Sequence, residues 1–345
     1  MSRHFKINKI NANIISLIAM LIYCLPTIGD AASFAFSGVD YPSASLTFVY
    51  GINSNNVVAG YYFDASGSHG FTLDGSTYSS FDRPGAASGT TAATGINDSG
   101  TVVGFYQTAA GANRGFIKSG TTYTALNVSG STDTWAYGIN NVGQVVGYYI
   151  DNVNGFAHGF VRTGTTFTTL NVPGTNTTDT YAYGINAAGK VVGSFSDDTG
   201  QHGFIYANGV YTTVNHPSAV YGTVLNGING NNAVVGTYIG QDGVITRGFL
   251  LDGTNYTPLD NPSATDGTFP EAINDGGTVA GYFYDATGLG THGFKAVANA
   301  TPAQVPLPPA ASALLGLLLA GLGLASRARG LPSARSSGLA WFARI

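Results

Sequence analysis

The sequence is poor in charge and nearly lacks glutamate. Only 9% of its 345 residues are charged, 14 Lys or Arg and 18 Asp or Glu, whereas an average soluble domain carries about 25%. Glu271 is the single glutamate. Because helix surfaces are usually built from Glu, Lys and Arg, the composition argues against a helical protein. No basic patch is present, so we expect no nucleic-acid partner.

Cysteine is scarce too, and its position points to an export signal. The only cysteine, Cys24, lies in an apolar run from 14 to 25 that follows Arg3, Lys6 and Lys9. Small residues at 29–33 offer cleavage sites, so 1–32 is predicted to be a signal peptide; an uncleaved anchor is the alternative. The mature chain would then have no disulfide, and packing and sheet hydrogen bonds must stabilise it.

The C-terminal end carries a second predicted targeting signal. A Pro-rich linker at 300–309 precedes a predicted transmembrane helix and basic stop at 310–329, and we expect 330–345 to be a disordered tail. The motif and the stop consist of Val305, Pro306, Leu307, Pro308, Arg327 and Arg329. An ordinary C-terminal membrane anchor is the alternative reading.

This tail resembles the PEP-CTERM family of sorting signals, in the variant whose motif reads Val-Pro-Leu-Pro-Ala. Two departures are Pro309, which interrupts the motif, and the extension 330–345 after the basic cluster. The resemblance implies export through the inner membrane of a Gram-negative bacterium. It also implies processing by an exosortase as partner, and a place at the cell surface or in the extracellular matrix.

What the chain has in quantity is glycine, with 49 residues, and aromatic residues, with 20 Tyr and 19 Phe. These favour short strands and tight turns. A Gly-Ile-Asn motif recurs at intervals of 43 to 46 residues, and Val-Val-Gly and His-Gly-Phe follow it within each unit. The six copies of the first motif stand at 51–53, 95–97, 138–140, 184–186, 227–229 and, as Ala-Ile-Asn, 272–274.

Each unit predicts four strands, which is the period of a β-propeller blade. The sixth unit lacks a fourth strand, while the segment 36–42 matches 78–84 and 256–262 position for position. We therefore expect an all-β, six-bladed β-propeller over 34–299, whose last blade the N-terminal strand completes. Closure would remove open sheet edges.

The repeats resemble the HAF family of extracellular repeats, in which Gly-Ile-Asn, Val-Val-Gly and His-Ala-Phe recur. Here the last motif reads His-Gly-Phe, or Arg-Gly-Phe at Arg114 and Arg247. The resemblance implies a secreted repeat protein and brings no defined activity.

The repeated histidines invite a metal interpretation, which their spacing argues against. Equivalent positions lie far apart in a propeller, and arginine, which replaces two of them, cannot ligate zinc. We expect a structural bond from each side chain to the backbone, and we expect the Asn after each Ile to form a turn. The histidines are His69, His158, His202 and His292.

The acids fall mainly in the second-to-third and fourth-to-first loops, which share one face of a propeller. The region 34–299 has 17 acids and seven bases, a net charge of −10. This face could bind calcium or a hydroxyl-rich ligand, although Asp is also a common turn residue. The candidate ligand-binding residues are Asp64, Asp82, Asp151, Asp197, Asp198, Asp242, Asp266, Glu271 and Asp285.

Catalysis has one candidate, Glu271, which is predicted at the entrance to an innermost strand. A lone carboxylate lacks a paired acid or base, and Asp266 is the one partner that we consider for it. We therefore predict no enzyme and no required cofactor, with calcium as an open option. The function we expect is a structural or adhesive role at the surface or in exopolymer. A lectin-like propeller that binds polysaccharide is the alternative; a glycan hydrolase or lyase ranks below both.

Overall fold

The computed structural model describes residues 34–174, 176–285 and 290–299, and Ser33–Asn299 form one compact unit. All regular elements of the described residues are strands. The expected all-β fold built from four-stranded sheets is therefore confirmed.

Three sheets hold four strands each, in sequence order. The first consists of β2 (Leu46–Ile52), β3 (Val58–Asp64), β4 (Gly67–Asp74) and β5 (Thr77–Phe81). The second consists of β6 (Ala92–Ile96), β7 (Val102–Gln107), β8 (Asn113–Ser119) and β9 (Thr122–Leu126). The third consists of β10 (Ser131–Ile139), β11 (Val145–Asp151), β12 (Ala157–Thr163) and β13 (Thr166–Leu170).

The other strands repeat this pattern in three groups, joined by the single parallel pairings of Gln201 with Gly222 and Thr246 with Gly267. One group is β14 (Thr180–Ile185), β15 (Val191–Asp197), β16 (Gly200–Ala207) and β17 (Val210–Val214). The next is β18 (Gly222–Ile228), β19 (Val234–Ile239), β20 (Thr246–Asp252) and β21 (Asn255–Pro258). The last is β22 (Gly267–Ile273), β23 (Val279–Tyr284), β24 (Thr291–Ala298) and β1 (Phe34–Gly38), which pairs antiparallel with β24.

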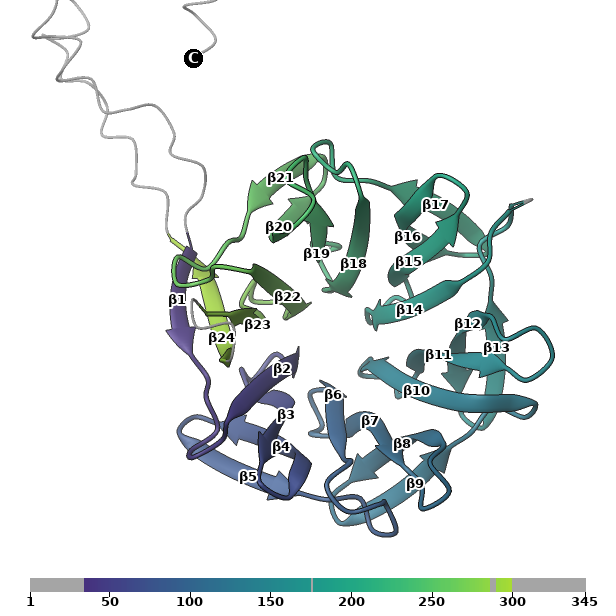
Figure 1. The fold of residues 1–345 in the computed structure, drawn as a ribbon, viewed down its shortest axis with the longest axis vertical. Helices are drawn as coiled ribbons and strands as arrows, with labels where there is room; N and C mark the ends of the chain where they lie inside the picture. Colours follow the sequence, from purple (N-terminus) through teal and green to yellow (C-terminus); the bar gives the residue numbers. More distant parts are fainter. Residues whose placement is uncertain (1–33, 175, 286–289, 300–345) are drawn as a thin grey trace, which may run out of the picture. The chain divides into compact units, whose positions relative to one another are not determined.

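The strand groups stand around a common centre (Figure 1). The innermost strands, β2, β6, β10, β14, β18 and β22, each begin a group and surround the axis. The last strand of each group lies outermost. Each group thus runs from the axis outward, and the loops at the strand ends gather on two opposite faces.

The hydrophobic core lies between the sheets. The Phe of each His-Gly-Phe or Arg-Gly-Phe motif is fully buried, as Phe160 shows on β12. Phe160 packs with Val103 of the preceding sheet and with Val145 of its own. The same arrangement recurs with Phe71, Phe116, Phe204, Phe249 and Phe294. One aromatic side chain per repeat therefore joins neighbouring sheets, which explains why this motif recurs.

The glycine of Gly-Ile-Asn permits the innermost strands to approach one another. A Cβ on Gly51 would lie 3.0 Å from the Cα of Gly95, and one on Gly138 would lie 2.7 Å from the carbonyl oxygen of Tyr183. Larger side chains would push neighbouring strands apart. The repeat therefore reserves this position for the smallest residues, with Ala272 in the last copy.

Both predicted address segments lie outside the described residues. These are the signal peptide at 1–32, the linker at 300–309, the helix at 310–329 and the tail at 330–345. Within 34–299, apart from its undescribed gaps, no helix is long and apolar enough to cross a membrane.

Candidate functional site

Six asparagines form a ring of hydrogen bonds around the axis. The side-chain Nδ2 of each Asn in the Ile-Asn motif donates to the backbone carbonyl oxygen of the Asn in the next repeat. The bonds run from Asn53 to Asn97, Asn140, Asn186, Asn229, Asn274 and back to Asn53, over 3.0 to 3.2 Å. The ring borders a small opening of about 90 Å³.

The same asparagines also form turns, as expected. Asn53 Oδ1 accepts hydrogen bonds from the backbone N–H groups of Asn55 and Val57. Asn186 Oδ1 does the same with Ala188 and Lys190. The predicted turn role is confirmed, and each side chain additionally binds the neighbouring repeat.

One residue interrupts the pairing of each innermost strand with its neighbour. It stands directly before the Gly-Ile-Asn or Ala-Ile-Asn motif, where the register shifts as in a β-bulge. We call these six residues the axial layer: Tyr50, Thr94, Tyr137, Tyr183, Asn226 and Glu271. Their side chains converge, because the Tyr137 ring lies 6.4 Å from that of Tyr50 and 5.2 Å from that of Tyr183, both from other sheets.

Stacked rings extend the axial layer into two aromatic walls. The first wall, from β2, β3, β22 and β23, contains the stacked pairs Phe48–Tyr61 and Phe269–Tyr282, with ring centroids 4.9 and 4.8 Å apart. The second, from β10, β11 and β14, contains Trp135, whose ring lies 4.8 Å from that of Tyr148.

Small side chains hold the equivalent positions between the walls. The innermost strands β6 and β18 lie between the strands of the two walls (Figure 1). They carry Ala92 and Val224 where the walls carry Phe48, Trp135 and their counterparts. At this position of the innermost strands, aromatic side chains therefore alternate with small ones, while Phe105 on β7 lies beside Ala92 with its ring 6.4 Å from that of Tyr137.

Glu271, on β22, lies among these tyrosines. Burial raises the pKa of its carboxyl to about 8, yet the residue retains partial solvent accessibility. Its charge acts on the tyrosines around it and helps to raise the pKa of Tyr50 and Tyr282, where burial is the larger cause. No described residue donates a hydrogen bond to this carboxylate or forms an ion pair with it.

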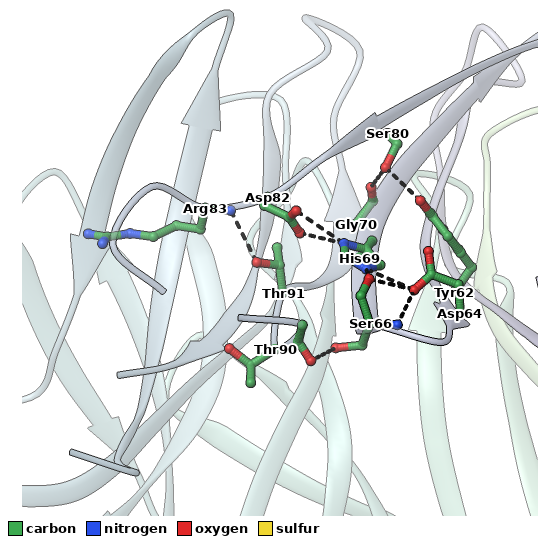
Figure 2. A network of polar contacts seen from close by, with 12 residues as sticks. Tyr62, Asp64, Ser66, His69, Gly70, Ser80, Asp82, Arg83, Thr90 and Thr91 are labelled. Carbon is green, nitrogen blue, oxygen red and sulfur yellow. Dashed lines mark hydrogen bonds and ion pairs between the residues drawn. The ribbon is translucent and has the colours of Figure 1, made fainter. Parts of the chain in front are cut away.

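The repeated histidines bind side chains, so the prediction of backbone partners is wrong. His69 Nδ1 lies 2.9 Å from Asp82 Oδ1, and its Nε2 lies 2.8 Å from Ser66 Oγ and 3.3 Å from Asp64 Oδ1 (Figure 2). Figure 2 shows both acids directed toward the imidazole from its two sides. The carboxylates are stronger acceptors than a carbonyl and lie within reach at the strand ends.

In the second and third of these copies, the histidine again contacts the residue 13 positions after it in the sequence. His158 Nδ1 lies 2.8 Å from Asn171 Oδ1, and His202 Nδ1 lies 3.2 Å from Asn215 Oδ1. In the last copy the partner comes from the start of the chain, because His292 Nδ1 lies 3.0 Å from Asp40 Oδ2. Arg114 is the exception, since it donates to backbone carbonyls, among them that of Thr132.

The predicted ligand-binding acids divide into separate groups. Asp64 and Asp82 meet at His69, Asp197 lies beside His202, Asp242 pairs with Arg247 at 2.8 Å, and Asp285 lies beside His292. Three others do not join these pairs. Asp151 accepts from the backbone of Val153, Asp198 from Asn176, and Asp266 is exposed.

Glu271 stands apart from all of them, at the axis. Among the residues that the structure describes, no group of three or more acids, histidines or cysteines could hold a metal ion.

Sequence reasoning found Glu271 but placed it wrongly at the entrance to its strand, since it lies at the bulge near the end of β22. The axial tyrosines were missed. The signal was present, because the residue before Gly-Ile-Asn varies in an otherwise regular repeat and is Tyr at positions 50, 137 and 183. Its meaning depends on the bulge, which removes this residue from the ordinary alternation of a strand.

Comparison with known proteins gives likenesses of fold alone. No protein family and no curated protein matches the chain. Among solved structures, AofleA from Arthrobotrys oligospora is 15% identical, with 76% of this chain and 86% of that chain covered and a TM-score of 0.47. The lectin of Aleuria aurantia in complex with Fucα1-6GlcNAc is 10% identical, with 75% and 97% covered and a TM-score of 0.46.

A gluconolactonase from Xanthomonas campestris is 8% identical, with 79% and 99% covered and a TM-score of 0.44. At these identities and TM-scores the likenesses carry no information on ligand or activity.

Proposed function

We propose that the chain is a six-bladed β-propeller whose last blade is completed by β1. The pairing of β1 with β24, from Phe34 opposite Ala298 to Gly38 opposite Phe294, supports this completion. The hydrogen bond from Asn274 to Asn53 supports contact between the last and first blades. A closed ring would present one axis and one site.

We infer that this site binds carbohydrate, so that the protein acts as a lectin-like propeller. The observation that carries the proposal is the pair of aromatic walls around Glu271. Flat rings such as Trp135 and Phe48 provide stacking surfaces for the apolar faces of sugars, and tyrosine hydroxyls provide hydrogen-bond partners. A structural or adhesive role at the cell surface would then follow from binding polymer.

Binding is favoured over catalysis because the carboxylate is alone. Most glycoside hydrolases use two carboxyl groups that flank the bond they cleave. Asp266 is exposed, whereas burial raises the pKa of Glu271. We therefore propose a non-enzymatic protein that needs no cofactor. Whether calcium assists binding is tested by measuring glycan binding with and without it.

The proposed location rests on the sequence of the two ends. The signal at 1–32 would direct export through the inner membrane. The motif Val305, Pro306, Leu307 and Pro308 would present the chain to an exosortase, while the helix at 310–329 holds it in the membrane. Deleting 305–345 should change the fractionation of the protein between membrane and medium; unchanged localisation would reject the sorting signal.

The binding proposal is tested with the exported protein on an array of bacterial and plant glycans, with and without calcium. Trp135→Ala should weaken any binding about tenfold or more, because stacked aromatic groups dominate such contacts. Tyr221→Ala changes an exposed ring and serves as the matched control. If no glycan binds in either condition, the proposal of a lectin-like function is rejected.

A further inference from the structure

The unpaired carboxylate of Glu271 is the exception within the axial layer. The other short polar side chains there bind the backbone of the next innermost strand. Thr94 Oγ1 donates to the carbonyl oxygen of Ala136 over 2.8 Å, and Asn226 Nδ2 donates to that of Pro270 over 3.0 Å. Once its carboxyl is ionised, Glu271 can donate no hydrogen bond and so cannot repeat this contact.

Leaving such a group unpaired in the interior opposes folding. Glu271 is partly shielded from water, and no described residue supplies its carboxylate with a counter-ion or a hydrogen-bond donor, so its lost hydration is not replaced. At the equivalent position of β18, Asn226 has a hydrogen-bond partner for its side-chain Nδ2. A carboxylate here therefore fits a ligand that brings the missing positive charge.

We propose that Glu271 and the tyrosines around it form a subsite for a primary ammonium group carried on a sugar, as in a de-N-acetylated hexosamine. The carboxylate would accept hydrogen bonds from the ammonium, and the faces of neighbouring tyrosines would attract its charge. The sugar part rests on the proposed carbohydrate-binding function, whereas the ammonium part does not.

The composition of the site favours ammonium over a metal ion. Calcium takes six to eight oxygen ligands and is usually held by several carboxylates, but no second acid of the described part of the chain lies beside Glu271. The described residues provide no metal-binding group. None of the described Lys, Arg and His residues is paired with this carboxylate, so an incoming cation competes only with a proton.

The groups that face Glu271 do not titrate near neutral pH. They are the tyrosines Tyr50 on β2, Tyr61 on β3, Tyr183 on β14, and Tyr282 and Tyr284 on β23. Burial raises the pKa of each above its ordinary value of 10.0. Between pH 6 and 8, Glu271 is therefore the group of this site whose ionisation changes, and cation binding should release its proton.

Methylammonium is a suitable small probe, because an alkylammonium ion stays charged well beyond pH 8. Its binding to the exported protein is followed by NMR of the tyrosine rings. Glu271→Gln should weaken binding by at least about tenfold, and Asp252→Asn, which removes an exposed acid elsewhere, should leave it unchanged. Equal affinity of wild type and Glu271→Gln would overturn the proposal.

A second test needs no variant and therefore remains possible if Glu271→Gln fails to fold: the methylammonium affinity of the wild-type protein is measured as a function of pH. Methylammonium affinity should rise with pH from 6 to about 8, by up to about tenfold per unit, as the carboxyl ionises. A flat profile would overturn the proposal, because the carboxylate would then take no part in binding.

Sugar oligomers separate this inference from the proposed function. Oligomers of glucosamine should bind at least about tenfold more tightly than those of N-acetylglucosamine, which lack the charge. Equal binding of both would overturn the amino-sugar subsite while leaving the lectin intact. Failure of both, with Glu271-dependent methylammonium binding retained, would reject the lectin and the sugar part while leaving the ammonium site.

Discussion

Asn274 in the last repeat donates a hydrogen bond from its side-chain Nδ2 to the backbone carbonyl oxygen of Asn53 in the first repeat, over 3.0 Å and 221 positions of sequence. The same bond joins Asn53 to Asn97, only 44 positions apart. In every other pair of repeats this bond joins consecutive repeats, whereas here it joins the last repeat to the first. The bond at the junction should therefore matter for keeping the two ends of the domain together.

Asn274→Ala should destabilise the fold by about 1–3 kcal/mol, because it leaves the N–H of Thr278 without its acceptor and removes a donor from the buried carbonyl of Asn53, which keeps only the N–H of Asn56. The free energy of unfolding is measured with denaturant. Asn152→Ala, at an exposed loop residue, is the control. A loss no larger than that of the control would mean that the ring contributes nothing to stability.

Much of the architecture could be predicted from the repeat alone. The Gly-Ile-Asn, Val-Val-Gly and His-Gly-Phe motifs mark strands because each has a local cause: a close approach, a turn or a buried ring. The match of the segment 36–42 to 78–84 predicted a strand beside the last repeat, where β1 pairs with β24.

The site could not be predicted in the same way, because it depends on convergence. Tyr50 and Tyr137 are two repeats apart, and only the ring arrangement brings their side chains within 6.4 Å. The hydrogen-bond partners of the histidines could not be predicted for a related reason. Asp82 lies 13 positions after His69 and meets it only because β4 and β5 pair in one register.

The glycine of Val-Val-Gly offers a sharper test of packing. A Cβ on Gly104 would lie 2.0 Å from the carbonyl oxygen of Ala92, on the adjacent innermost strand. Gly104→Ala should therefore destabilise the fold by at least about 2 kcal/mol, or prevent folding, since backbone must move. Gly38→Ala is the matched control, because a Cβ there meets nothing within 4 Å. Equal stability of the two variants would contradict the packing argument.

His292 should make the junction of β1 and β24 sensitive to pH. Burial lowers the pKa of this imidazole, but Asp40 and Asp285 outweigh burial and raise it above 6.5. A raised pKa means that the stabilisation is present below the unfolded value and is lost as pH rises through the folded value.

Unfolding measured from pH 5.5 to 8.5 should therefore show a contribution that declines with pH and that His292→Gln removes. Asp252→Asn, an exposed acid away from the junction, should keep the wild-type profile. If His292→Gln also keeps it, the ion pair with Asp40 does not stabilise the attachment of β1.

Glu271 should act on stability with the sign opposite to that of an ordinary paired carboxylate. Burial raises the pKa of its carboxyl from 4.5 to about 8, so the native state holds a proton that the unfolded chain releases. Stability should then decline as pH rises from about 4.5 to 8, by less than about 1.4 kcal/mol per unit because water reaches part of the residue.

Glu271→Gln removes this titration, so the variant should be as stable as wild type near pH 5 and more stable near pH 8. Denaturant unfolding at the two pH values measures the difference. A variant that is less stable than wild type at pH 8 would mean that the carboxylate has a stabilising partner in the folded protein. Added methylammonium should stabilise the wild type at pH 8 and have little effect on the variant. The difference in free energy of unfolding between wild type and variant should then become smaller, because a bound cation compensates the charge that destabilises the wild type.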